Sequence, residues 1–124
     1  MRVVAPLALM GVIFYLSAQQ AVGPSLPEWT RWVAHFSEYA ALAALWIWAL
    51  APAFGRRAIW AAIAISFAFA ISDEIHQSFV AGRDSDPLDV VVDSIGIAVA
   101  AVVCGRVFWR SRGGEDNAEP GPAW

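Results

Sequence analysis

Four apolar stretches, separated by short polar segments, constrain the fold of this chain more than any other feature. They cover residues 3–18, 33–54, 58–80 and 88–109. The last three have the roughly 20-residue length that a helix needs to cross a bilayer. The first is shorter and follows Arg2, as in a secretory signal, but no clean small-x-small cleavage site follows it. We therefore expect an all-α integral membrane protein with four retained transmembrane helices in a compact bundle.

The composition also favours lipid over water as the solvent of this chain. Hydrophobic residues make up 59% of it and charged residues 15%, whereas soluble domains average about 25% charged. A soluble domain of 124 residues could not bury so much apolar surface. All eight basic residues are arginine and the net charge is -3, so a nucleic-acid partner is not expected. The single cysteine, Cys104, excludes an internal disulfide and a cysteine-based zinc site.

Glycine and proline mark the predicted connections between the helices. Residues 19–32 are expected to form a loop, Pro52 and the Arg56–Arg57 pair a tight turn, and residues 82–87 another. From Ser111 onward glycine, proline and acidic residues predominate. We therefore predict a membrane domain over residues 1–110 and a disordered cytoplasmic tail over 111–124.

The distribution of arginine predicts the orientation of the bundle. If the helices alternate in direction, six arginines fall on one side and only Arg31 and Arg83 on the other. The six are Arg2, Arg56, Arg57, Arg106, Arg110 and Arg112. Cytoplasmic loops carry the excess of arginine in membrane proteins. We therefore expect a multi-pass protein of the cytoplasmic membrane with both termini in the cytoplasm.

Ionisable and amide side chains interrupt the apolar stretches at a common depth, near the predicted outer ends of three helices. They are His35 and Glu38, then Asp73, Glu74, His76 and Gln77, and finally Asp89 and Asp93. At a rise of about 1.5 Å per residue, all of them lie in the outer part of the bilayer or at its surface. Ionisable groups at that depth are costly and usually mark function.

The spacing of these residues predicts which of them share a face. His35 and Glu38 are three residues apart, and Asp73 shares a stripe with His76 and Gln77. Glu74 points about 100° away from Asp73 and is expected to serve a different partner. The face of Asp89 and Asp93 continues through Gly96 and Ala100, whose small size lets another helix approach. We therefore predict one polar pocket, capped by Arg83 from the adjoining loop.

Two chemistries are open to such a pocket. Its five carboxylates and two histidines offer general acids and bases. Alternatively, a divalent metal ion could be held by carboxylate and imidazole ligands. Arg83 would bind a phosphate or carboxylate of a ligand through its planar guanidinium.

A purely structural role is the alternative to a functional site. Polar residues between membrane helices often form hydrogen bonds that hold the bundle together, each worth roughly 0.6 to 2 kcal/mol. Seven ionisable groups at one depth exceed what that role requires, so we favour a site. The tryptophans are expected to be interfacial anchors and lipid-facing bulk. They are Trp29, Trp32, Trp46, Trp48, Trp60 and Trp109.

Several sequence blocks resemble the VanZ-like family. They are residues 72–83 (SDEIHQSFVAGR), Asp89-Val90, 93–96 (DSIG), 35–39 (HFSEY) and 14–17 (FYLS). The resemblance extends from about Phe14 to Gly105. One departure is Ala81, where the family usually has proline before Gly-Arg.

The resemblance implies a small bacterial membrane protein, and the namesake of the family is associated with resistance to the glycopeptide teicoplanin. It does not specify a reaction, a cofactor or an oligomeric state. Our first hypothesis is an enzyme acting on an envelope lipid or cell-wall-linked substrate. A non-catalytic protein that binds a glycopeptide, a lipid headgroup or a partner is the second. A small oligomeric transporter is the third, because four helices are few for alternating access.

Overall fold

The computed structural model describes residues 1–19 and 26–115, and this part of the chain contains four helices and no strand. The helices are α1 (Val4–Ser17), α2 (Glu28–Phe54), α3 (Arg57–Ser78) and α4 (Pro87–Glu115). The predicted all-α bundle is therefore confirmed. By length and composition α2, α3 and α4 could each cross a membrane, whereas α1 is a shorter apolar helix of 14 residues.

Two helix boundaries differ from the prediction. Residues 28–32 are expected in a loop, but α2 already begins at Glu28. The extended backbone of Pro27 precedes this helix, and an acidic residue in a first turn interacts favourably with the helix dipole. At the other end of the chain α4 continues to Glu115, five residues past the predicted domain boundary. The remainder of the predicted tail, residues 116–124, lies outside the described residues.

The connections on either side of α3 are short and depend on glycine. Gly55 has a φ of 54° and ends α2, and Gly82 has a φ of 79° in the connection to α4. Glycine adopts this left-handed conformation at little cost. Pro87 occupies the first turn of α4, where its missing N–H costs nothing. The Asp86 carboxylate then accepts a hydrogen bond from the Leu88 N–H at 2.9 Å.

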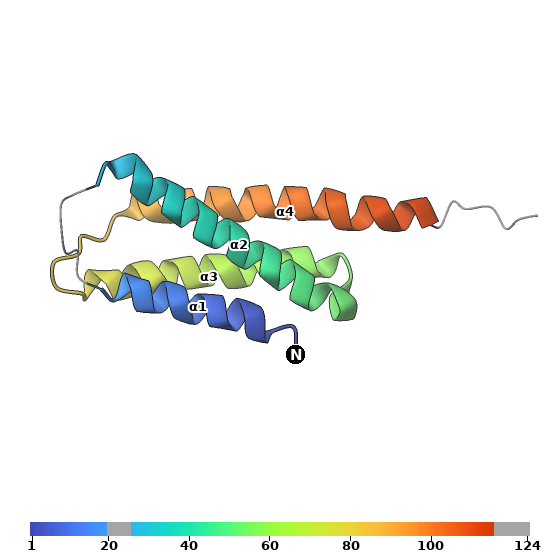
Figure 1. The fold of residues 1–124 in the computed structure, drawn as a ribbon, viewed down its shortest axis with the longest axis horizontal. Helices are drawn as coiled ribbons and strands as arrows, with labels where there is room; N and C mark the ends of the chain where they lie inside the picture. The colour runs from blue at the N-terminus through green and yellow to red at the C-terminus, as the bar shows by residue number, and fades with distance from the viewer. Residues whose placement is uncertain (20–25, 116–124) are drawn as a thin grey trace, which may run out of the picture.

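The helices alternate in direction, so the bundle has two distinct ends (Figure 1). At one end the C-termini of α1 and α3 lie near the N-termini of α2 and α4, and we call this the polar end. The other end carries the turn between α2 and α3 and the C-terminal part of α4. We call it the arginine end, because Arg56, Arg57, Arg106 and Arg110 lie there. The two ends carry the arginine asymmetry that the sequence predicts.

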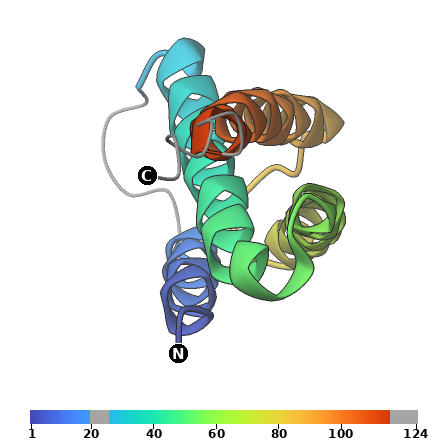
Figure 2. The same ribbon diagram turned by 90° about the vertical axis from the view of Figure 1, so that its right-hand side faces the viewer.

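Helix α2 is the centre of the bundle. It runs diagonally between α1 on one side and α3 and α4 on the other (Figure 2), and it contacts all three. Tyr39, Leu42 and Ile47 of α2 are fully buried against small residues such as Ala62 of α3. Small residues let backbones approach closely where no hydrophobic effect drives association.

The predicted close approach at Gly96 is confirmed. A Cβ atom built on Gly96 would lie 2.5 Å from the backbone oxygen of Phe36, so α2 and α4 are in backbone contact there. One expectation for the tryptophans is wrong. Trp46 is only 8% exposed and belongs to the core, whereas Trp60 is 74% exposed, as expected of a lipid-facing side chain.

Candidate functional site

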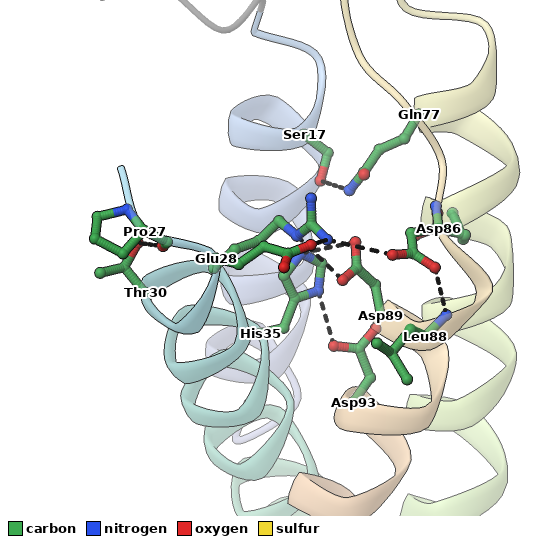
Figure 3. Close-up of polar contacts among 12 residues, drawn as sticks. Ser17, Pro27, Glu28, Thr30, His35, Gln77, Asp86, Leu88, Asp89 and Asp93 are labelled. Atoms are coloured by element: carbon green, nitrogen blue, oxygen red, sulfur yellow. Dashed lines mark hydrogen bonds and ion pairs between the residues drawn. The ribbon is translucent and has the colours of Figure 1, made fainter. Parts of the chain in front are cut away.

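The residues that the sequence predicts to form one pocket all lie at the polar end. Most of them belong to two separate groups of polar contacts instead of surrounding a single centre. The first group joins α2 to α4 (Figure 3). His35 Nδ1 lies 2.9 Å from Asp93 Oδ1, and its Nε2 lies 3.8 Å from Asp89 Oδ2. Asp89 and Asp93 are each 1% exposed. The imidazole of α2 is therefore held between two buried carboxylates of α4.

Arg31 extends this first group towards the surface. Its guanidinium lies 3.3 Å from Asp86 Oδ2, and its Nε lies 3.3 Å from Asp89 Oδ1. A longer contact of 3.7 Å joins it to Glu28. Charge from Arg31 thus offsets part of the negative charge of Asp89. In the sequence, Arg31 serves only to predict the orientation in the membrane and is not placed in the pocket. Its position four residues before His35, on the same helix face, could have indicated that it belongs there.

The second group joins α1 to α3. Ser17 Oγ donates a hydrogen bond to Asp73 Oδ2 at 2.8 Å, and Gln77 Nε2 donates to both Ser17 Oγ and Asp73 Oδ2 at 3.3 Å. All three side chains are buried. The predicted stripe of Asp73 and Gln77 is therefore confirmed, and its partner is α1. In the sequence Ser17 stands out only through its place in a family block.

Two predicted residues have separate roles. Glu74 accepts a hydrogen bond from the backbone N–H of Asp86, so it points to a different partner, as its position in the helix predicts. This contact ties the end of α3 to the connection before α4. His76 stacks on Phe14 of α1, with ring centroids 3.9 Å apart and planes inclined by 14°. It helps to hold α1 against α3.

A cavity of about 120 Å³ connects the two groups. Ser17, His35 and Gln77 line it, together with Glu38 and Arg83, for which the sequence predicts a place in the pocket. Arg31 lines it as well, and Ile13, Leu16 and Ala34 provide apolar wall. The predicted cap by Arg83 therefore agrees with its position in the structure. Glu38 reaches the cavity from the same helix face as His35.

Several buried polar atoms of the bundle have no hydrogen-bond partner among the described residues. They include Asp73 Oδ1 and the Tyr39 hydroxyl. Tyr39 lies four residues after His35, and the sequence does not predict it as part of the site. Most buried polar atoms in proteins are paired. Tyr39 and Asp73 are close enough to interact directly, so these unpaired atoms do not by themselves indicate a ligand.

The arrangement does not provide an evident metal site. In the described part of the chain no three His, Cys, Asp or Glu side chains are placed so that together they could hold a metal ion. His35 is engaged with Asp89 and Asp93, while His76 packs against Phe14. What the geometry does offer is an imidazole–carboxylate pair beside two arginines and Glu38.

Comparison with known proteins identifies the family of this chain. No curated protein and no solved structure matches the chain. The family model VanZ/LLP1 matches residues 3–109, which contain all four helices up to the last turns of α4 and every residue of the polar cluster. This match confirms the resemblance predicted from the sequence blocks. The chain is a helical membrane protein and belongs to the VanZ/LLP1 family.

Proposed function

We propose that the polar cavity binds the anionic headgroup of an envelope lipid or cell-wall-linked substrate outside the cytoplasmic membrane, and that His35 and Glu38 act on it by acid–base chemistry. The observation that carries the proposal is the convergence of Arg31, Arg83, His35 and Glu38 on one cavity. Ionisable groups buried between membrane helices are costly to maintain, which favours a functional role.

The size of the cavity sets the class of ligand. A volume of about 120 Å³ accommodates a phosphate or carboxylate group but not a whole glycopeptide. Arginine binds such planar or tetrahedral anions through paired N–H donors. Arg83 forms no ion pair with a carboxylate among the described residues, whereas Arg31 forms three. Arg83 is therefore the better candidate for the ligand.

The orientation predicted from the arginines agrees with this substrate class. The positive-inside rule assigns the arginine end to the cytoplasm and the polar end to the outside. A headgroup of the outer leaflet then enters the cavity without crossing the membrane. On this proposal, the association of the family's namesake with teicoplanin resistance would be an indirect effect. It would arise because the protein changes a component of the cell envelope.

For a phosphate ester the proposed chemistry is a hydrolysis. A water oxygen forms the new bond to phosphorus while the ester P–O bond breaks. His35 accepts the proton of that water, and Glu38 in its protonated form returns a proton to the leaving oxygen. The carboxylate of Asp93, 2.9 Å from His35 Nδ1, orients the imidazole and stabilises its charged form.

A second candidate function is binding without chemistry. It is favoured by the engagement of both ring nitrogens of His35 with carboxylates and by the low exposure of that side chain. In this case the cluster would hold a headgroup or a partner in place. The alternative of an oligomeric transporter has no comparable observation in its favour.

The two functions can be distinguished with protein in detergent and a series of lipids that carry phosphate esters. Turnover is measured as released phosphate or alcohol, and affinity is measured in parallel. If the chain is an enzyme, His35→Gln abolishes turnover while affinity changes less than about threefold, and Arg83→Gln weakens affinity. If it only binds, no lipid is turned over and both substitutions weaken affinity in graded fashion. An absence of both binding and turnover across the series would refute the proposal.

A further inference from the structure

The arginine end has a cavity of its own, far from the polar cluster. Its volume is about 450 Å³, and it lies between the turn that joins α2 to α3 and the C-terminal half of α4. Arg56, Arg106 and Arg110 line it together with Trp109. Its remaining lining consists of the small or apolar residues Ala101, Val102 and Gly105. A charged side and an apolar side thus meet in one cavity.

All the charged residues that line this cavity are arginines, so its charge is positive. Arg106 and Arg110 are four residues apart and share a face of α4, and Arg56 approaches from the neighbouring turn. The Arg56 guanidinium lies 5.9 Å from the centre of the Trp109 ring. The described residues that line the cavity include no Asp or Glu. None of the three arginines pairs with a carboxylate in the part of the chain that the structure describes. An anion in the cavity would relieve their mutual repulsion.

We expect the cavity to lie at the depth of lipid phosphates. Asp89 and Arg106 are separated along α4 by about 26 Å, at about 1.5 Å per residue. The hydrocarbon core of a bilayer is about 30 Å thick. With Asp89 at one membrane surface, Arg106 and Arg110 therefore lie at the headgroup level of the opposite surface. Val102, which is 54% exposed, lies one turn deeper, at the level of acyl chains.

The floor of the cavity depends on a glycine. A Cβ atom built on Gly105 would lie 3.3 Å from Cδ1 of Ile59 in α3. The absence of a side chain at this position therefore lets α3 and α4 approach closely beneath the arginines. The cavity therefore combines an apolar part of its lining with three arginines, and the Trp109 indole is of a kind that suits the membrane interface.

We propose that this cavity binds the phosphate headgroup of an anionic phospholipid from the leaflet at the arginine end. Arg106 and Arg110 would bind the phosphate oxygens through their guanidinium forks, and Arg56 would close the site from the α2–α3 turn. The first methylene groups of the acyl chains would lie on Ala101 and Val102. Basic pockets between helices on the cytoplasmic side of membrane proteins recognise lipid headgroups by the same chemistry.

The test is native mass spectrometry of the full chain in detergent with phosphatidylglycerol, with zwitterionic phosphatidylcholine as the reference lipid. The variant Arg106→Gln/Arg110→Gln removes two charges from the cavity. Its matched control, Arg2→Gln/Arg57→Gln, removes two charges from the same end of the molecule without touching the cavity lining. At roughly fivefold per arginine, the cavity variant should lose at least about tenfold in affinity for phosphatidylglycerol. The control should lose less than about threefold.

Further variants separate a defined lipid site from misfolding and from diffuse attraction to charge. Arg106→Lys/Arg110→Lys keeps the charge and should recover part of the affinity, which excludes misfolding as the cause of the loss. All of these lipid measurements are made in an Arg83→Gln background, so that the polar cavity contributes little and failure here is distinct from failure at the polar cavity. Equal losses in the cavity variant and its control would overturn the proposal, because they would indicate diffuse attraction to charge. Equal affinity for phosphatidylcholine, or displacement of the lipid by millimolar inorganic phosphate, would also overturn it.

Discussion

Asp93 makes a short, buried polar contact that joins α4 to α2. Its carboxylate is 1% exposed and lies 2.9 Å from the imidazole of His35. Breaking a buried pair by removing one partner costs about 3–5 kcal/mol, because the other partner is left without compensation. We therefore expect Asp93→Ala to lower the free energy of unfolding by about this amount, measured by denaturant titration in detergent.

Asp84 offers the control for this substitution. It is exposed in the connection before α4, so Asp84→Ala should change stability by less than about 0.5 kcal/mol. If Asp93→Ala were as mild as Asp84→Ala, the His35–Asp93 pair would not hold the two helices together.

At the same scale, spacing along one helix predicted correctly which residues share a face. His35 and Glu38 both line the polar cavity, and Asp73 and Gln77 share one hydrogen-bond cluster. Spacing could not predict which residue of another helix each would meet. The contacts from His35 to Asp93 and from Asp73 to Ser17 join residues more than 50 positions apart. They depend on how far one helix is shifted and rotated against the next.

The helices α2 and α4 are in close backbone contact at Gly96. A Cβ atom there would lie 2.5 Å from the Phe36 oxygen, which is backbone and cannot rotate away. We expect Gly96→Ala to destabilise the bundle by about 1–3 kcal/mol or more, because the two helices must separate. Unfolding in detergent measures this directly.

Gly11 in α1 is the matched control, because among the described residues no atom beyond its own stretch of helix lies within 4 Å of a Cβ built there. In Gly11→Ala the better helix propensity of alanine should leave stability unchanged or raise it by up to about 1 kcal/mol. Equal effects at the two glycines would show that α2 and α4 do not pack as the structure has them.

The helices themselves were predictable because a bilayer requires long apolar segments that satisfy their own backbone hydrogen bonds. The residues at which the helices begin and end were harder to predict. The apolar run predicts a later start for α2, whereas the helix starts at Glu28, directly after Pro27. Hydrophobicity identifies only the part of a helix that lies in the membrane core. It does not detect a polar turn by which the same helix extends into the headgroup region.

For the whole molecule, the predicted orientation assigns the polar end to the outside. Ser85 at the polar end and Ser111 at the arginine end are both exposed, so each can be replaced by cysteine in a Cys104→Ser background. A membrane-impermeant maleimide applied to intact cells should label Ser85→Cys and leave Ser111→Cys unlabelled until the cells are permeabilised. The reverse pattern would place the polar cavity in the cytoplasm and exclude an outer-leaflet substrate.

The central claim is that the polar cavity binds an anionic headgroup rather than serving only to hold the helices together. Its most direct test is the affinity for a lipid phosphomonoester such as phosphatidic acid. The measurement uses the Arg106→Gln/Arg110→Gln background, so that the arginine end contributes little. Arg83→Gln should weaken binding by about tenfold or more, as expected for loss of a charge-assisted contact. Arg57→Gln removes the same charge far from the cavity and should change affinity by less than about twofold. Equal affinities in the two variants would contradict the claim.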